Sequence, residues 1–281
     1  MSSDSTLRAL TVELASSAPE PPPMPDLDRR GSQRLAGPRL AVAVALVAVI
    51  VPLAVVAVWP TITSRRTVDA RTAETSLFQA AGAAHVAIVA DDGVVMRGYL
   101  WSGSHHGVII TQGFGSDPTD IVALASAAAH EGATVLLYSP RGTGLSEGEP
   151  DAALLEPDMR AAVRDLLTRG VDTVTIVAFN HSGTALIDLA ADPMPALRDV
   201  VAVFPFARYQ SLDATDSIGK VAIPITLIGV AYPSPLGPEV VRLGNAAENS
   251  TVDIYEHPGQ DVPILEATMP KLVELIRQMS R

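Results

Sequence analysis

The sequence predicts an α/β protein with a mostly parallel central sheet, helices on both faces of the sheet, and one transmembrane helix ahead of it. Three observations predict this organisation. Short apolar runs rich in β-branched residues alternate with helical segments after residue 83. Glycine-rich loops follow several of these runs. An uninterrupted apolar stretch, Leu40–Trp59, precedes them all.

The composition of the chain excludes several classes of function. The formal net charge of −11, without a basic stripe, argues against nucleic-acid binding. The chain contains no cysteine, so disulfides, cysteine-ligated zinc and a thiol nucleophile are excluded. No group of His, Asp and Glu has metal-ligand spacing, and we interpret His105 and His106 as loop residues. We therefore expect neither a metal nor a cofactor.

The first 59 residues contain two predicted segments. Residues 1–39 hold a proline cluster and few large apolar groups, which predicts a disordered tail that is either a plain linker or a partner-binding segment. Residues 40–59 carry no charge, and a helix of this length spans a bilayer. A cleaved signal peptide is the alternative, but the run starts some 40 residues in and lacks an obvious cleavage site.

Arginines on the two sides of this apolar run predict its orientation. Four arginines precede it, and three follow it: Arg29, Arg30, Arg34 and Arg39, then Arg65, Arg66 and Arg71. The slight bias favours a cytoplasmic tail and an extracytoplasmic C-terminal part in the cell envelope. Residues 60–82 are a polar connector that could be helical, and residues 83–281 are the predicted folded domain.

Within that domain, strands and helices alternate. The strands are expected at His85–Ala90, Val94–Trp101, Val108–Gln112, Thr134–Tyr138, Thr173–Phe179, Val200–Phe204, Ile225–Val230 and Val252–Tyr255. Helices are expected at Ile121–His130, at Pro157–Arg169, from Thr184 to Ala190, and over a last segment from Leu265 to Met279. Asp91-Asp92-Gly93 between the first two strands is typical of a hairpin turn.

Three glycine-rich loops follow predicted strands, and their order along the chain is informative. They are Gln112-Gly113-Phe114-Gly115-Ser116, Ser139-Pro140-Arg141-Gly142-Thr143-Gly144-Leu145-Ser146, and Asn180-His181-Ser182-Gly183. Over roughly residues 84–280 this arrangement resembles the α/β-hydrolase superfamily, with Gln112 in place of the family's His and Ser139 in place of its Asp. The resemblance implies a nucleophile at a strand–turn–helix elbow and an oxyanion pocket at Gly113, Phe114 and the His181 amide. About 18 residues separate Phe206 from Ile225, so we expect a minimal lid or none.

Two registers fit the elbow. In the first, Ala178 and Gly183 occupy the family's small-residue positions, which puts Asn180 at the nucleophile position. In the second, Ser182 is the nucleophile, but Asn180 and Thr184 then stand where small residues must let helix and strand approach. We favour the first. An Asn amide is not a nucleophile at ordinary pH, although Asn accepts the positive φ of such a turn.

The acid and base positions also depart from the family pattern. Ala231 or Tyr232 stands where the resemblance implies the acid; Glu239 is the nearest carboxylate there, and Asp213 is an alternative after the preceding strand. Gln260 or Asp261 stands at the base position. His257 lies three or four residues early, and we interpret it as a surface or edge histidine in preference to a general base.

Together the three departures predict a catalytically degenerate hydrolase-like domain, a pseudoenzyme that binds a small-molecule ligand or an envelope protein partner. Two hypotheses stay open beside it. One is an active serine hydrolase, an esterase, lipase or peptidase, that uses Ser182 with His257. The other is a sensor domain that serves the N-terminal tail. His181 either contacts a bound ligand or is a partly buried, hydrogen-bonded histidine.

Overall fold

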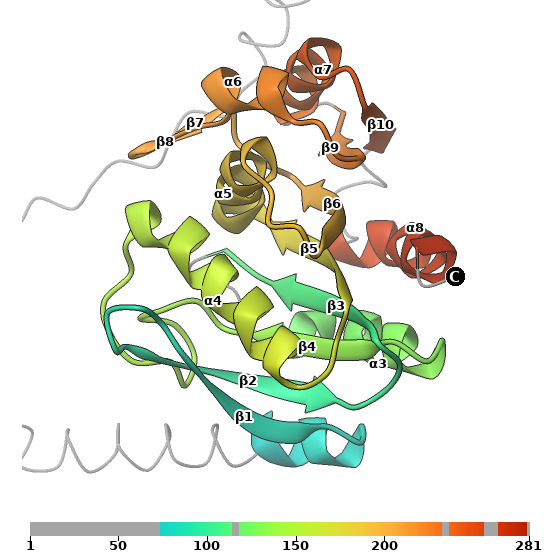
Figure 1. Cartoon of the computed structure of the whole chain (residues 1–281). Helices are drawn as coiled ribbons and strands as arrows, with labels where there is room; N and C mark the ends of the chain where they lie inside the picture. Colours follow the sequence, from blue (N-terminus) through green and yellow to red (C-terminus); the bar gives the residue numbers. More distant parts are fainter. Residues whose placement is uncertain (1–73, 114–117, 232–235, 256–263, 280–281) are drawn as a thin grey trace, which may run out of the picture. The chain divides into compact units, whose positions relative to one another are not determined.

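The computed structural model describes residues 74–113, 118–231, 236–255 and 264–279, all within one compact unit (Figure 1). The predicted tail (1–39) and transmembrane segment (40–59) lie outside the described residues. No helix among the described residues has both the length and the apolar character needed to span a bilayer.

An eight-stranded sheet forms the centre of the fold. In chain order its strands are β1 (Ala84–Val89), β2 (Val95–Trp101), β3 (His106–Thr111), β4 (Thr134–Tyr138), β5 (Thr173–Phe179), β6 (Leu197–Val203), β9 (Ile225–Val230) and β10 (Ser250–Tyr255). Their spatial order is β1-β2-β4-β3-β5-β6-β9-β10. The pairs β1–β2 and β2–β4 are antiparallel, and every later pair is parallel. The expected mostly parallel sheet is therefore confirmed.

Helices connect these strands. The α-helices are α3 (Val122–His130), α4 (Leu155–Thr168), α5 (Asn180–Ala191), α6 (Ala214–Ser217), α7 (Leu236–Ala246) and α8 (Ile264–Met279). Short 3₁₀ turns are η1 (Pro118–Ile121), η2 (Ala152–Leu154) and η3 (Ile218–Lys220). A small hairpin, β7 (Arg208–Tyr209) with β8 (Leu212–Asp213), stands in the connection between β6 and β9.

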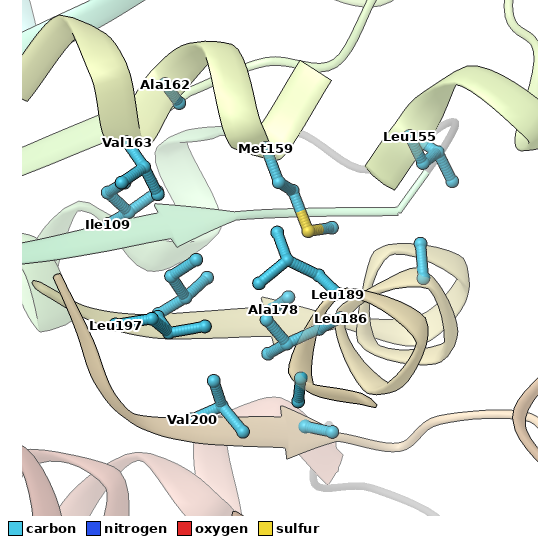
Figure 2. Close-up of a cluster of buried hydrophobic side chains, with 14 of the residues drawn as sticks. Ile109, Leu155, Met159, Ala162, Val163, Ala178, Leu186, Leu189, Leu197 and Val200 are labelled. Carbon is cyan, nitrogen blue, oxygen red and sulfur yellow. The ribbon is translucent and has the colours of Figure 1, made fainter. Parts of the chain in front are cut away.

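Both faces of the sheet are buried. Ile109, Ile176 and Val200 pack on one face against α4 and α5, and their neighbours in the strands pack on the other face against α3 and α8. Figure 2 shows the first cluster, in which Met159 of α4 points toward Leu186 and Leu189 of α5. Burial on two faces explains why the central strands are continuous apolar runs without polar alternation.

The folded part begins ahead of residue 83. Residues 74–80 are helical, and Phe78 is fully buried against Tyr99, with ring centroids 3.8 Å apart. The Tyr99 hydroxyl donates a hydrogen bond to the Glu74 carboxylate at 3.0 Å. The end of the predicted connector 60–82 is thus helical and contributes a core aromatic side chain.

Candidate functional site

The site is built around the sharp turn between β5 and α5. The chain passes directly from the extended Phe179 into the helix at Asn180, whose φ is +52°. That conformation is rare for residues other than glycine, and Asn adopts it more readily than most. The first register expects a strained residue at this position, and Asn180 occupies it, half-buried at the carboxyl end of the sheet. The helix begins four residues earlier than the sequence predicts.

Close backbone approaches hold the turn on both sides. A Cβ atom added to Gly183 would lie 2.9 Å from the Ala178 carbonyl oxygen, so only glycine fits where α5 crosses β5. A Cβ atom on Gly113 would lie 3.0 Å from the Asn180 Cβ and 3.3 Å from the His181 amide nitrogen. The loop after β3 therefore lies directly against the elbow and beside the amide that the family resemblance implies for the oxyanion pocket.

Ser182 lies below the turn, in the first turn of α5. Its side chain is fully buried, and its hydroxyl donates a hydrogen bond to the Gln112 carbonyl oxygen at 2.5 Å. This bond ties the helix to the end of β3. In this geometry the buried hydroxyl acts as a structural hydrogen-bond donor.

His181 packs against two aromatic rings that follow β6. Its ring centroid is 3.8 Å from that of Tyr209 and 5.1 Å from that of Phe206, with the Phe206 ring nearly parallel. Burial lowers the pKa of His181, which favours the neutral imidazole. The three rings form an aromatic cluster next to the elbow.

The segment that carries these rings is fixed to α5 and α7. The Thr184 hydroxyl accepts a hydrogen bond from the Phe206 amide at 3.0 Å. The Glu239 carboxylate accepts one from the Ala207 amide at 3.1 Å. Phe204, at φ +53°, turns the chain from β6 into this segment. The neighbouring parallel strands β5 and β6 are thus each followed by a residue other than glycine with positive φ. Such strained residues are common in functional sites, which in α/β sheets lie at the carboxyl ends of the strands.

The candidate acids do not form a catalytic triad with the described histidines. Ala231 is described and has no carboxylate; its amide donates to the Tyr255 carbonyl at 2.7 Å. Glu239 is used to hold the Ala207 amide. Asp213 caps α6 and pairs with Arg208 at 2.9 Å, and hydrogen bonds from Thr215 lower the pKa of its carboxyl. None of the three contacts a histidine among the described residues.

Several sequence candidates cannot be placed relative to the elbow. Phe114, Tyr232, His257, Gln260 and Asp261 lie outside the described residues. His106, interpreted as a loop residue, instead begins β3, where it contacts Thr173 and Thr175. Among the residues that the structure describes, no cluster of three His, Asp or Glu side chains could hold a metal ion.

A second loop at this edge, residues 139–146 after β4, is held by buried charges. Arg141 donates two hydrogen bonds to the Asp158 carboxylate, at 2.8 and 2.6 Å, and one to Asp92 at 2.7 Å. Asp158 is fully buried, and its hydrogen bonds raise the pKa of Arg141. The Ser146 hydroxyl closes the loop on the Ser139 carbonyl at 2.7 Å.

A pocket of about 400 Å³ lies beside the segment that carries Phe206 and Tyr209. It is bounded by residues 207 and 208, by α6 and η3, and by α7. Apart from Glu239, which was named as the carboxylate nearest to the acid position, the sequence did not single out the residues of this pocket, nor the rings of Phe206 and Tyr209. The one hint of this region in the sequence is the short stretch between Phe206 and Ile225, which predicts only that a lid is minimal or absent.

The chain is similar to known proteins in its sequence and in its fold. No family model matches the chain. A polyketide transferase of Aspergillus fumigatus, af380, is 30% identical over 128 residues, which cover 42% of this chain and 44% of that protein. A thiohydrolase of Arthrinium phaeospermum, apmlB, is 36% identical over 126 residues, which cover 41% and 40%. The matches thus span less than half of these curated relatives.

Solved structures match over a longer stretch. The Pyrococcus furiosus esterase Pf2001 superposes with a TM-score of 0.58 at 15% identity, over 70% of this chain and 90% of that one. The α/β hydrolase GrgF from Penicillium sp. sh18 gives 0.60 at 15% identity, over 70% and 98%. Est1E from Butyrivibrio proteoclasticus gives 0.56 at 13% identity, over 69% and 96%. Identities this low establish a common fold and leave the activity to be argued from the site.

Proposed function

The chain has the α/β-hydrolase fold, and on that premise we propose that it binds a ligand or a protein partner without covalent serine catalysis. One observation carries the proposal: the strained residue at the tip of the elbow is Asn180. In this fold the tip presents the nucleophile, and an amide side chain cannot attack a carbonyl at ordinary pH.

The burial of Ser182 supports the same proposal. A serine nucleophile needs an exposed hydroxyl within reach of a base. The Ser182 hydroxyl is fully buried and already donates to the Gln112 carbonyl. To attack a substrate, Ser182 would have to break this bond and α5 would have to unwind its first turn.

We further propose that residues 40–59 anchor the protein in a membrane with residues 83–281 outside the cytoplasm. The length and lack of charge of this run support anchoring, and the arginine bias supports the orientation. Protease added to intact cells should remove the C-terminal domain and leave residues 1–39 protected. Full protection of the domain in intact cells would contradict the orientation.

A fluorophosphonate probe tests the proposal on catalysis. The full-length chain in detergent is incubated with the probe, and intact mass is measured, with Ser182→Ala as the control. We expect no mass increase in either protein. A mass increase in the wild-type chain that Ser182→Ala abolishes would establish the serine hydrolase in place of the binding protein.

That serine hydrolase is the alternative function. The similarity to a protein named as a thiohydrolase and to esterase structures favours it, as does the His181 amide beside the loop after β3. It would use Ser182 with a base such as His257. It requires an elbow conformation in which Ser182, and not Asn180, reaches the surface.

A further inference from the structure

We propose that the 400 Å³ pocket between residues 207–218 and α7 binds an organic monoanion, a carboxylate carried on an apolar body. The inference rests on the proposed function in one respect: it supplies the ligand class for a protein that works by binding. The pocket has a volume within the usual range for small-molecule sites.

The lining of the pocket divides into an apolar part and a charged part. The apolar part comes from three separate elements and consists of Ala207, Ile218, Leu243 and Ala246. Ile218 and Leu243 are almost fully buried members of the core, so this wall is rigid. An apolar wall of this kind favours a ligand with a hydrocarbon or aromatic body and disfavours an inorganic ion.

The charged part consists of two arginines and one glutamate. Arg208 and Arg242 line the pocket together with Glu239 and no other charged residue among those described. Arg208 is already paired with Asp213 at 2.9 Å, so Arg242 is the cation that remains for a ligand, and it matches a ligand that carries a single negative charge. A dianion would leave one charge uncompensated beside the Glu239 carboxylate.

The three charged side chains are held in different ways. The Glu239 carboxylate accepts a hydrogen bond from the Ala207 amide and so fixes the edge of the pocket. Arg208 is oriented by Asp213 at 2.9 Å and by the Thr215 hydroxyl at 3.4 Å. No described carboxylate lies within ion-pair distance of Arg242, which is exposed on α7. Arg242 is therefore the cation that an incoming carboxylate would pair with.

The location of the pocket is separate from the elbow. Phe206 and Tyr209 point to His181, whereas residues 207 and 208 between them line the pocket. The chain as a whole carries −11, which repels anions from most of its surface. Arg242, which has no described ion pair, is the feature of this pocket that attracts an anion.

Titration calorimetry with 4-phenylbutyrate and its neutral amide, 4-phenylbutyramide, tests the inference on the full-length chain in detergent. We expect the acid to bind with a Kd of about 1 mM or tighter, and the amide to bind at least about tenfold more weakly. Equal binding of the two, or no binding of the acid at this level, would overturn the proposal.

Two variants locate the site. Arg242→Gln removes the cation without a described ion pair, and Ala246→Phe fills the apolar part from an exposed position. Each should weaken 4-phenylbutyrate binding about tenfold or more. Arg164→Gln, which removes an arginine paired with Asp91 away from the pocket, is the matched control and should bind like the wild type. Wild-type affinity in Arg242→Gln and Ala246→Phe contradicts the site.

The outcome is distinguishable from that of the proposed function. Covalent labelling at Ser182 would refute the non-catalytic proposal and leave acid binding at Arg242 intact. A chain that neither labels nor binds the acid would keep the non-catalytic proposal and refute this pocket.

Discussion

Two tight loops at the carboxyl edge of the sheet are held by different means. The loop after β4 is tied down by the buried Arg141, whose guanidinium contacts Asp158 and Asp92. The elbow after β5 has no such ion pair among the described residues and depends on the close fit of Gly183 and on the Ser182 hydrogen bond.

This difference distinguishes residues that stabilise the fold, such as Arg141, from the position that would carry out chemistry, which is the elbow tip. Arg141 and its partners contribute to stability whether or not the protein is an enzyme. At the elbow tip, by contrast, the fold demands only a residue that tolerates positive φ, which Asn180 provides. The scaffold can therefore persist while the nucleophile position changes.

The largest expected effect is on the loop after β4. Asp158→Ala leaves the buried Arg141 without its two-bond partner, so the free energy of unfolding should fall by about 3–5 kcal/mol, measured by urea denaturation. Asp165→Ala is the control on the same helix, because its pair with Arg169 lies near the surface. It should cost about 1 kcal/mol or less. Equal losses in the two variants would contradict the role of the buried pair.

A smaller loss is expected when the elbow is overpacked. Gly183→Val places a side chain against the Ala178 carbonyl and should lower the free energy of unfolding by about 1–3 kcal/mol. Gly219→Ala is a suitable comparison, since the nearest atom to its added Cβ is 3.7 Å away. Its stability should match the wild type; if Gly183→Val does so too, helix and strand are not in close contact at the elbow.

Stability at the tip should depend on how readily the residue at position 180 adopts positive φ. Asn180→Gly should keep wild-type stability, because glycine adopts positive φ without strain. Asn180→Ser should lower the free energy of unfolding by about 1 kcal/mol, since serine adopts this conformation less readily. Thermal denaturation of both variants gives the difference. A serine variant more stable than the glycine variant would mean that position 180 does not hold a positive φ.

The smallest effect concerns Asp199, a buried acid whose pKa is dominated by burial in spite of a nearby arginine. Asp199 accepts a hydrogen bond from Thr175 at 2.5 Å, and Arg198 stands 3.8 Å away. Burial raises the pKa of Asp199, so its contribution to stability is present at low pH and is lost as pH rises through the folded-state pKa. Asp199→Asn removes this dependence.

Urea denaturation of Asp199→Asn across pH measures this effect. The variant should gain stability relative to the wild type as pH rises from about 4 to 7. A relative loss over that interval would show that the neighbours of Asp199 stabilise its carboxylate.

Local pattern was enough to predict much of the sheet. Thr134–Tyr138, Thr173–Phe179 and Ile225–Val230 are strands with the predicted bounds, because apolar β-branched runs between turns allow few alternatives. The pattern did not predict that α5 begins at Asn180, since this depends on the contact of Gly183 with Ala178.

The sequence pattern could not predict contacts between residues that are far apart in the sequence. The stacking of His181 on Tyr209 and the bond from Ala207 to Glu239 join residues from different elements. The pocket depends on the same arrangement, because β7, β8 and α6 are too short to leave a periodic signal. Even so, the ambiguity between Asn180 and Ser182 was visible in the sequence.

Cysteine substitution tests directly which of these two residues stands at the tip. The chain has no cysteine, so Asn180→Cys and Ser182→Cys each carry one thiol. In the folded full-length protein we expect iodoacetamide to alkylate Asn180→Cys readily, because the thiol is accessible at a helix N-terminus, which favours the thiolate. Ser182→Cys should stay unmodified until urea unfolds the domain. Rapid alkylation of Ser182→Cys with protection of Asn180→Cys would contradict the account.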